Sequence, residues 1–447
     1  DGRPPIVMYS IRTPENMEKT KKSIAQYSKH DAEVWHELRS KVAAMDPQLA
    51  AAFYSPPMQP TPEIPDPVNF MTIQQMEALG LPRHFGVSSA KAIIDHCFES
   101  DELRALLYRM SVEWGCPLNM EGLGSMVIFA VLWVTLNWRL SVGGTHTFAH
   151  ALAMAAVKEG VHIYENSDVV KILVENGKAV GVRLASGEEI EARKLVSSNA
   201  CAKQTLLRLV GEEHLSPLWA KRAKEQIQGP SCVLASTAFA LHEAPRYKSA
   251  RWNPDIDRCY YTVTGFDTAQ QVHDYCADAE SGRIPSRPGV GTYVNSLWDP
   301  TYAPPGKHSL TGWLFFPVAS AYTEKEWDEC RRTYNQKIID HFVHWAPNMT
   351  RENVLDDFFY TPLDQEREMR LMEGDFNNGA VRPDQLGWMR PFPEASKYKT
   401  EIENLYMCGP CMHPGGGISA GSGYASYKQV AEDYGLKKLW EGHPRGY

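Results

Sequence analysis

The residues best placed for chemistry lie in a glycine-rich segment near the C-terminus, Asn404–Ala425. Its apolar start, Leu405–Cys408, is typical of a buried strand, and Pro414 is followed by three successive glycines. Glycines let a backbone approach a ligand closely because no Cβ stands in the way. A helix of small residues, expected from about Ile418, would offer unpaired N–H groups and a partial positive charge. The pattern favours a site for the electron-rich edge of a flavin ring, and the alternative is a tight loop with close helix packing.

Histidines supply the candidates for catalysis. His413 lies inside the glycine-rich segment, where it either polarises flavin or substrate or fixes the loop through a backbone hydrogen bond. His146 and His150 are four residues apart in an expected helix, so both side chains lie on one face. The pattern offers no third ligand, so we predict no metal site. His146 is a candidate substrate-facing residue, and the alternative is a structural histidine.

Two cysteines in the same segment have the spacing of a thioredoxin-type redox motif, Cys408-Gly-Pro-Cys411. Such a motif needs its first cysteine at a helix N-terminus. Here a loop follows instead, so we interpret the spacing as coincidence, with a disulfide beside the flavin as the alternative. The chain has 9 Cys, an odd number that predicts free thiols in a reducing compartment, either the cytoplasm or an organelle interior such as the mitochondrial matrix.

The elements expected to position these residues are a helix, then a strand, then a β-meander, in that order along the chain. Gly143-Gly144 precede a helical pattern, Thr145–Glu159, with Gly160 as its stop signal. Asn176-Gly177 marks a hairpin turn. The strands expected here are Val161–Tyr164, Ser167–Glu175, Ala179–Leu184 and Glu189–Val196. Elsewhere we expect helices over Glu15–Met45, Asn69–Leu79, Ser88–Val112 and Glu324–Trp345, and strands over Cys232–Leu241, Gly291–Ser296, Ser309–Val318 and Ile402–Cys408.

Composition limits the class of protein. The 447 residues are 43% hydrophobic and 22% charged, ordinary values for a globular protein with a sizeable core. A net charge of -8 argues against a general nucleic-acid binder. The most apolar run, Met126–Trp138, is shorter than the roughly 20 residues that span a bilayer, so it predicts a buried helix or a cavity wall and no transmembrane helix. The 12 Trp and 20 Tyr suit either plain core or an aromatic substrate cavity.

The element order and two long segments carry a family resemblance. The segment from Gly143 to Ala200 and the C-terminal LYMCGPCMHPGGGISAGSGYAS resemble the phytoene desaturase-like flavoproteins. Members include carotenoid desaturases, retinol saturase and the mitochondrial pyridine nucleotide-disulfide oxidoreductase domain protein 2. Met17–Glu37 and Glu373–Leu386 extend the match over nearly the whole chain, and Glu373–Leu386 is most similar to the mitochondrial branch.

The resemblance implies FAD as cofactor and a set of residues that bind it. Val169 and Val170 would contact the adenine through backbone groups, and Ser198, Asn199 and Ala200 would lie near the dinucleotide. The residues implied around the ribityl chain and flavin ring are Gly409, Pro414, Gly415, Gly416, Gly417, Ile418 and Gly421. The Ile418 N–H would be the partner of flavin O2.

One departure from the family is large. Its members begin with a strand, a Gly-x-Gly-x-x-Gly turn and a helix that binds the pyrophosphate. This chain has no such unit, and Gly122-Leu-Gly124 lacks the third glycine. Either a separate subunit or cleaved fragment supplies the dinucleotide-binding half, or the chain is a truncated product. Its ordinary composition and the full match downstream favour a partner polypeptide.

These observations predict an α/β protein of mixed α+β character, with an incomplete FAD-binding flavoprotein fold and a substrate domain of mixed sheet and helices. We expect residues 141–215 and 396–447 to form the FAD-binding domain, and residues 1–140 and 216–395 the substrate domain. The expected activity is a dehydrogenase, desaturase or oxidase that passes a hydride from an apolar or aromatic small molecule to flavin N5. The alternatives are a non-catalytic partner subunit and a redox-neutral flavin isomerase.

Overall fold

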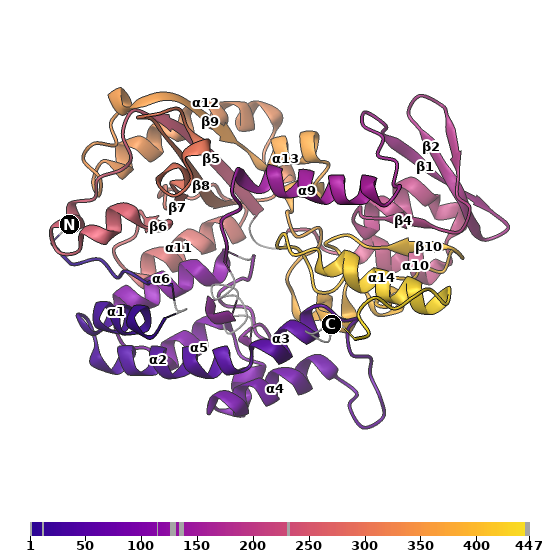
Figure 1. Ribbon diagram of the computed structural model, residues 1–447, viewed down its shortest axis with the longest axis horizontal. Coiled ribbons are helices and arrows are strands. Elements are labelled where there is room, and N and C mark those ends of the chain that lie inside the picture. Colours follow the sequence, from indigo (N-terminus) through magenta and orange to yellow (C-terminus); the bar gives the residue numbers. More distant parts are fainter. Residues whose placement is uncertain are drawn as a thin grey trace. The chain divides into compact units, whose positions relative to one another are not determined.

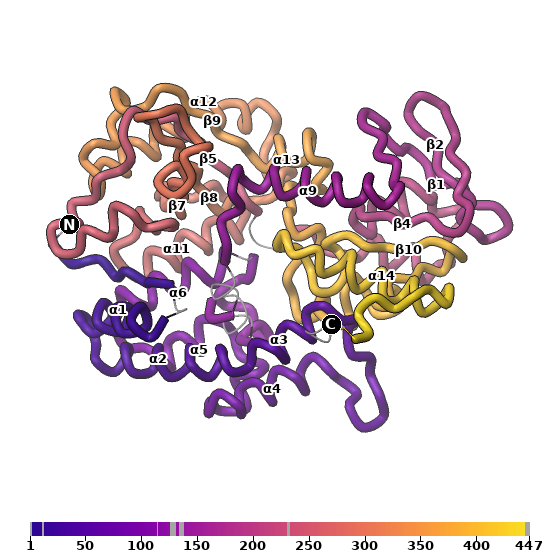
Figure 2. Tube along the Cα trace, viewed as in Figure 1, coloured from indigo at the N-terminus to yellow at the C-terminus, as the bar shows by residue number. Residues whose placement is uncertain are grey.

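The computed structural model describes residues 2–10, 13–113, 115–125, 131–133, 138–229 and 233–442. Its Cα packing divides the chain into two units, and each combines three segments that are distant in sequence and differ in colour along the trace (Figures 1 and 2). Unit 1 comprises Asp1–Ala43, Val87–His162 and Ser231–Gly374. Unit 2 comprises Ala44–Gly86, Ile163–Pro230 and Asp375–Tyr447.

Unit 1 is built on a five-stranded antiparallel sheet with the order β6-β7-β8-β5-β9. Its strands are β5 (Val233–Leu241), β6 (Tyr261–Thr264), β7 (Val290–Tyr293), β8 (His308–Phe316) and β9 (Val354–Tyr360). Helix α12 (Glu324–Phe342) packs its apolar side, including Trp327 and Ile338, against Phe316 and Phe359 of the sheet. The strands predicted from Cys232, Gly291 and Ser309 and the helix predicted from Glu324 are therefore confirmed.

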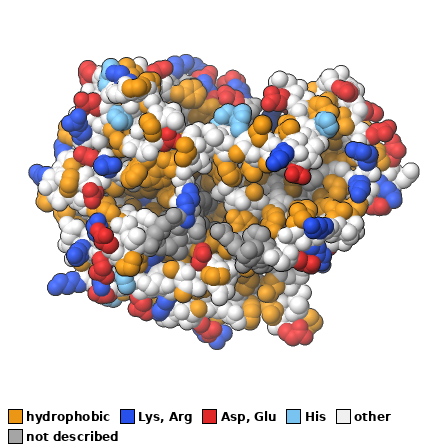
Figure 3. Space-filling view, in the orientation of Figure 1, with side chains coloured by type: hydrophobic (Ala, Val, Ile, Leu, Met, Phe, Trp, Pro, Cys, Tyr) orange, Lys and Arg blue, Asp and Glu red, His pale blue; other side chains and the backbone are white. Residues whose placement is uncertain are grey.

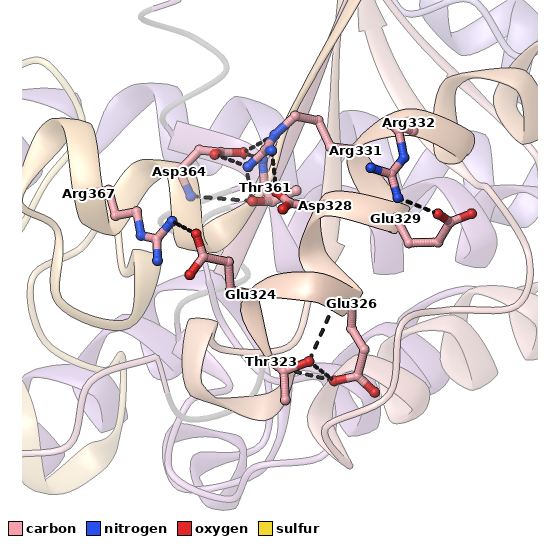
Figure 4. Close-up of polar contacts among 10 residues, drawn as sticks. All are labelled: Thr323, Glu324, Glu326, Asp328, Glu329, Arg331, Arg332, Thr361, Asp364 and Arg367. Carbon is pink, nitrogen blue, oxygen red and sulfur yellow. Dashed lines mark hydrogen bonds and ion pairs between the residues drawn. The ribbon is translucent and has the colours of Figure 1, made fainter.

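Two capping boxes fix the starts of α12 and of α13 (Pro362–Met369), as Figure 4 shows. The Thr323 hydroxyl accepts from the Glu326 N–H, and the Glu326 carboxylate accepts from the Thr323 N–H at 2.8 Å. Thr361 and Asp364 repeat the arrangement on α13. Each box satisfies N–H groups that a helix start otherwise leaves unpaired. Arg331 of α12 donates to Asp364, so the two helices are also joined by an ion pair.

Unit 1 also contains six further described α-helices. They are α1 (Pro14–Ala25), α2 (Lys29–Ala44), α5 (Ala90–Cys97), α6 (Asp101–Val112), α9 (Gly144–Lys158) and α11 (Ala269–Glu280). The predicted helices Glu15–Met45 and Ser88–Val112 are each two helices. In the second case Ser100 has an extended backbone before α6, which a continuous helix does not allow.

Unit 2 contains a meander and a short parallel pair. The meander has the order β1-β2-β3, with β1 (Val169–Glu175), β2 (Lys178–Leu184) and β3 (Glu189–Glu191). Asn176 and Gly177 both have positive φ, 49° and 77°, as the predicted hairpin turn requires. The other elements are α3 (Asp46–Phe53), α4 (Pro67–Leu79), β4 (Val196–Ser198), a π-helix (Lys203–Gly211), α10 (Pro217–Glu225), β10 (Leu405–Met407) and α14 (Gly421–Asp433).

Three further predicted elements differ in the structure. Glu189–Val196 is not one strand, because β3 ends at Glu191 and β4 begins at Val196 in a different sheet. Val161–Tyr164 forms no strand, and its apolar side chains are exposed, because no described strand lies beside it to share hydrogen bonds. Helix α14 begins at Gly421 and not at Ile418, since Ile418 and Ala420 both have left-handed φ. Of the apolar run 126–138, residues 126–130 and 134–137 lie outside the described residues, and Val131–Trp133 is buried. Among the helices that are described, none has the length and apolar character needed to cross a membrane.

The packing units also divide the chain differently from the predicted domains. Segment 44–86 belongs to unit 2, where the Tyr54 ring contacts the Tyr424 ring of α14. The segment after Gly374 belongs there as well, because the Asp375 carboxylate accepts from the Gly229 N–H at 2.9 Å. Helix α9, expected in the FAD-binding part, packs with unit 1. The predicted boundaries followed the glycine-rich motifs and could not include these long-range contacts.

Helix α9 is unusual because it has almost no buried face. Only Gly144 is buried, although most of the helix is apolar. Phe148, Leu152 and Met154 are 40%, 50% and 68% exposed. In the space-filling view, hydrophobic side chains lie on the surface where α9 runs in Figure 1 (Figure 3). A helix that is apolar all round is normally covered by other protein or lipid.

Candidate functional site

The glycine-rich loop of unit 2 starts at a parallel strand pair. In this pair Leu405 of β10 lies beside Val196 of β4, and Met407 beside Ser198. The Cys408 N–H extends the ladder by donating to the Ser198 carbonyl at 2.9 Å. A Cβ on Gly409 would lie 2.0 Å from the Asn199 carbonyl oxygen, so only glycine fits this crossing. The structure thereby brings Ser198, Asn199 and Gly409, all predicted from the sequence, to one point.

The loop after Pro414 has a backbone conformation that few residue types adopt. Gly415, Gly417 and Ile418 have φ of 109°, 114° and 52°. For a β-branched residue such as Ile418 the left-handed region is strained, and such strain persists where the surroundings enforce it. Ile418 is also 70% exposed, so burial of its side chain is not what holds it there. Across the described chain, the N–H groups of Gly416, Gly417 and Ile418 donate to no protein acceptor.

Helix α14 supports the loop from behind. The Ser422 hydroxyl donates to the Gly415 carbonyl at 3.1 Å and to the Met412 carbonyl at 3.3 Å. Gly421 is buried at the helix start, where a Cβ would lie 2.9 Å from atoms of Phe53 and Pro414. The Met412 and Gly415 carbonyls therefore point toward α14, while the N–H groups of 416–418 stay open to a ligand.

His413 lies at the entry of the loop and is fixed in one tautomer. Its Nε2 donates to the Ala52 carbonyl at 3.2 Å, which leaves Nδ1 as the acceptor of the neutral ring. Burial lowers the pKa of His413 to about 4, so the ring is uncharged near neutral pH. The Tyr398 hydroxyl donates to the His413 carbonyl at 2.9 Å. The contact with Ala52 is the loop-fixing hydrogen bond considered from the sequence.

The two cysteines of the loop are free thiols. Burial raises the pKa of both Cys408 and Cys411, which disfavours the thiolate that redox exchange requires. The Cys411 thiol lies 3.5 Å from the Ala200 carbonyl, to which it donates. Their surroundings resemble those of structural cysteines, in line with the interpretation that the spacing is coincidence.

The other predicted site residues are divided between the two units. Val170, at the start of β1 in unit 2, is 48% exposed. Ser198 is buried and its hydroxyl is 2.7 Å from that of Thr205, while Asn199 is exposed. His146 and His150 lie on α9 in unit 1 with ring centroids 4.3 Å apart. Within the part of the chain that is described, no group of three or more His, Cys, Asp or Glu side chains could hold a metal ion.

Unit 1 contains a cavity of about 880 Å³, within the size range of small-molecule sites. Rings form much of its wall. The Trp138 ring lies 6.1 Å from that of Tyr260 and 5.7 Å from that of Tyr261, in edge and tilted contacts. Trp35 and Trp298 also line the cavity. The apolar run that ends at Trp138 thus contributes to a cavity wall, one of its two predicted roles.

A buried ion pair holds the aromatic wall from behind. The Glu113 carboxylate accepts hydrogen bonds from the Tyr261 hydroxyl at 2.9 Å and the Tyr293 hydroxyl at 3.0 Å. Arg109, fully buried, donates to the same carboxylate and to the Trp313 carbonyl. Burial raises the pKa of Tyr261 and Tyr293 well above the ordinary value, so both hydroxyls stay protonated and keep donating.

Comparison with known proteins places the chain in a family. Residues 74–333 match the family described as flavin containing amine oxidoreductase. Pyridine nucleotide-disulfide oxidoreductase domain-containing protein 2 of Mus musculus is 29% identical over 452 residues, which cover 94% of this chain and 75% of the mouse protein. A limonene dehydrogenase subunit from Castellaniella defragrans is 27% identical, with 95% of this chain and 78% of the bacterial protein covered. An oxidoreductase from Methanosarcina mazei has a similar fold, with a TM-score of 0.50 at 18% identity over 81% of this chain and 72% of that one.

The chain therefore belongs to the flavin-containing amine oxidoreductase family. It is an FAD-dependent oxidoreductase, as the resemblance in its sequence predicted. The loop fits this cofactor. It presents unpartnered N–H groups beside glycines, and ideal Cβ atoms on Gly415 and Gly416 would point toward Arg390 and Asn377, away from the open side of the backbone.

The sequence analysis did not single out the residues behind the cavity wall. Arg109 and Glu113 are spaced as an i, i+4 ion pair, which is the one signal that the sequence carries. That spacing is usually found on exposed helix faces, however. Only the packing of α6 against β8 reveals that the pair is buried and that two tyrosines depend on it.

Proposed function

We propose that this chain forms the flavin-ring and substrate parts of an enzyme that oxidises an apolar or aromatic small organic molecule. The observation that carries the proposal is the loop Gly415–Ile418, in which Ile418 has a strained backbone and the N–H groups of 416–418 have no acceptor among the described residues. Strain and unpaired donors are retained where a ligand uses them. When bound, FAD supplies the hydride acceptor at N5.

The residues implied by the family resemblance take their roles in this proposal. Gly409, Pro414, Gly415–Ile418 and Gly421 hold the flavin ring and ribityl chain, with the Ile418 N–H opposite flavin O2. Ser198 and Asn199 lie near the dinucleotide, and Val170 near the adenine. The positive end of α14 lies behind the same loop and favours negative charge on the bound ring edge.

The substrate is proposed to bind in the cavity of unit 1. Its rings offer broad apolar surfaces, and Glu113, paired with Arg109, fixes the orientation of one of them, Tyr261. These residues exclude water and orient the substrate but donate no proton to it. His413, with Nδ1 as a free acceptor, and His146 stay the candidates for contact with the reacting centre.

We further propose that the pyrophosphate-binding unit lies outside these 447 residues. Gly122 and Gly124 are not a substitute, because their N–H groups donate to the Val87 and Ser88 carbonyls at 2.6 and 2.7 Å. The uncovered apolar surface of α9 and the unpaired run Val161–Tyr164 support a missing neighbour. The relative from Castellaniella defragrans, similar over 95% of this chain, is named as one subunit of limonene dehydrogenase, which favours a second polypeptide as the source.

The deciding experiment is to purify the native protein with whatever accompanies it, then record its visible spectrum and subunit masses. We expect a flavin absorbance band and a second polypeptide that carries Gly-x-Gly-x-x-Gly. A colourless chain that no such polypeptide and added FAD can reconstitute would sink the proposal. If substrate turns over with no electron acceptor consumed, the reaction is a redox-neutral isomerisation on the same site.

Placement of the flavin ring is tested by Gly416→Val. An ideal Cβ on Gly416 lies 3.3 Å from the Asn377 side chain, so a branched side chain would push the loop off its support. We expect loss of flavin from the purified complex, measured as the ratio of flavin absorbance to protein absorbance. Gly423→Ala is the matched control, because its Cβ meets only the Cys408 carbonyl oxygen, at 4.0 Å. Unchanged flavin content in Gly416→Val would refute the placement.

A further inference from the structure

Arg390 is a buried arginine with an unusual set of partners. It is 2% exposed, and its guanidinium donates to backbone carbonyl oxygens alone among the described residues. These carbonyls belong to two separate segments. Those of the 377–385 segment are Asn377 at 2.8 Å, Gly379 at 3.2 Å, Ala380 at 3.3 Å and Gln385 at 3.2 Å; those of the loop are Pro410 at 2.8 Å and Met412 at 3.3 Å.

One nitrogen of this guanidinium joins the two segments directly. Nη2 donates both to Asn377 and to Pro410 at 2.8 Å. Arginine has five donors in a planar fork, whereas lysine has only three on one nitrogen, too few for the six carbonyls around Arg390. The guanidinium also lies close behind the loop, since an ideal Cβ on Gly415 would be 3.8 Å from Nε.

The 377–385 segment is itself anchored, so it can act as a fixed support. The Asp375 carboxylate accepts from the N–H groups of Gly229, Asn377 and Gly379, each at 2.9 Å. Gln385 accepts from the Ile227 N–H at 2.8 Å and donates to the Ile227 carbonyl at 3.1 Å. The chain of contacts therefore runs from residues 227–229 through 375–385 and Arg390 to the loop.

We propose that Arg390 is the positioning residue of the flavin-binding loop: it fastens Pro410 and Met412 to the 377–385 segment and thereby sets where Gly416–Ile418 present their N–H groups. The role of these N–H groups rests on the proposed function, but the fastening itself does not. Burying a guanidinium is costly unless its donors are satisfied. The carbonyls satisfy it here, and they would lose their own partners if it were replaced.

The test compares Arg390→Gln and Arg390→Lys with the purified wild-type protein, by hydrogen exchange and by its flavin spectrum. In Arg390→Gln we expect the hydrogen-bonded amides of Met412 in the loop and of Asn378, Ala380 and Gln385 in the other segment to exchange at least tenfold faster, while the β1–β2 hairpin of the same unit is unchanged. Flavin should dissociate at least tenfold more readily, and the absorbance band of the fraction still bound should shift. Lysine should restore neither property fully, because its three donors would leave at least three of the six carbonyls without a partner.

Arg382→Gln is the matched control, since Arg382 lies in the same segment but pairs on the surface with Asp384 at 2.9 Å. Unchanged exchange of the Met412 amide in Arg390→Gln would overturn the proposal. If neither variant folds, hydrogen exchange of the wild-type protein is the test. We then expect the loop and the 377–385 segment to open at the same rate, and different opening rates would refute the link. A wild-type protein without flavin would disprove the proposed function and leave the exchange test of the fastening valid.

Discussion

At the scale of single residues, the glycine-rich loop of unit 2 and the cavity wall of unit 1 each depend on groups held in one chemical state. His413 is neutral because burial opposes its charge. It has one tautomer because the Ala52 carbonyl accepts a hydrogen bond from its Nε2–H. Tyr261 and Tyr293 stay protonated because they are buried against the Glu113 carboxylate. None of these groups changes charge near neutral pH, which suits a reaction whose difficult chemistry belongs to the cofactor.

His413 predicts how stability depends on pH. Its pKa falls from the ordinary 6.5 to about 4 on folding, so between these values the unfolded chain binds a proton that the folded chain does not. The free energy of unfolding should therefore decrease as pH falls from about 6.5 toward 4. His413→Asn, which does not titrate, should lose less stability over this range in urea unfolding. An identical decrease in His413→Asn would contradict the assignment, and His30→Asn, at an exposed position, is the control.

At the scale of elements, the crossing of β4 and β10 places the loop. The two strands pair over only three residues each, so the position of the chain after β10 depends on a few close contacts. The closest of these contacts is that between Gly409 and the Asn199 backbone. Because Asn199 and Gly409 come from distant parts of the sequence, the strand pair is what turns two motifs into one site.

Gly409→Ala tests this crossing. A Cβ placed 2.0 Å from a carbonyl oxygen must move backbone, because no flexible side chain can yield. Forced overpacking of this kind typically costs about 1–3 kcal/mol. We expect a loss of that size in the free energy of unfolding by urea. Gly423→Ala, inside α14 with open space around it, should gain up to about 1 kcal/mol from helix propensity. Equal stabilities for the two variants would contradict the crossing.

At the scale of the whole molecule, each unit has its own hydrophobic core, yet α9 is left without a covering neighbour. The five-stranded sheet and α12 bury a large aromatic core in unit 1, while Ile172, Val210 and Leu405 belong to a smaller core in unit 2. Helix α9 takes part in neither core. Its exposed apolar side chains are the surface that the proposed second polypeptide would cover.

Leu152→Asp and Met154→Asp test this surface. In the isolated chain both residues are at least half exposed, so we expect stability to change by no more than about 0.5 kcal/mol. In the native preparation the accompanying polypeptide and the flavin should both be lost. Lys158→Asp, at the end of the same helix, should retain both. A large drop in the melting temperature of the isolated chain would mean that α9 is packed within it, contrary to the proposal.

The sequence alone determined the local features of this protein. The Asn176-Gly177 hairpin, the strand before Gly409 and the glycine loop follow from backbone preferences that depend on neighbouring residues, and the family resemblance identified the cofactor. Burial and long-range contacts are not local, so only the tertiary structure revealed the Glu113 and Arg109 pair behind Tyr261 and the carbonyls gathered around Arg390. The start of helix α14 at Gly421 is also a finding of the structure, because no local pattern predicts the left-handed φ of Ile418 and Ala420.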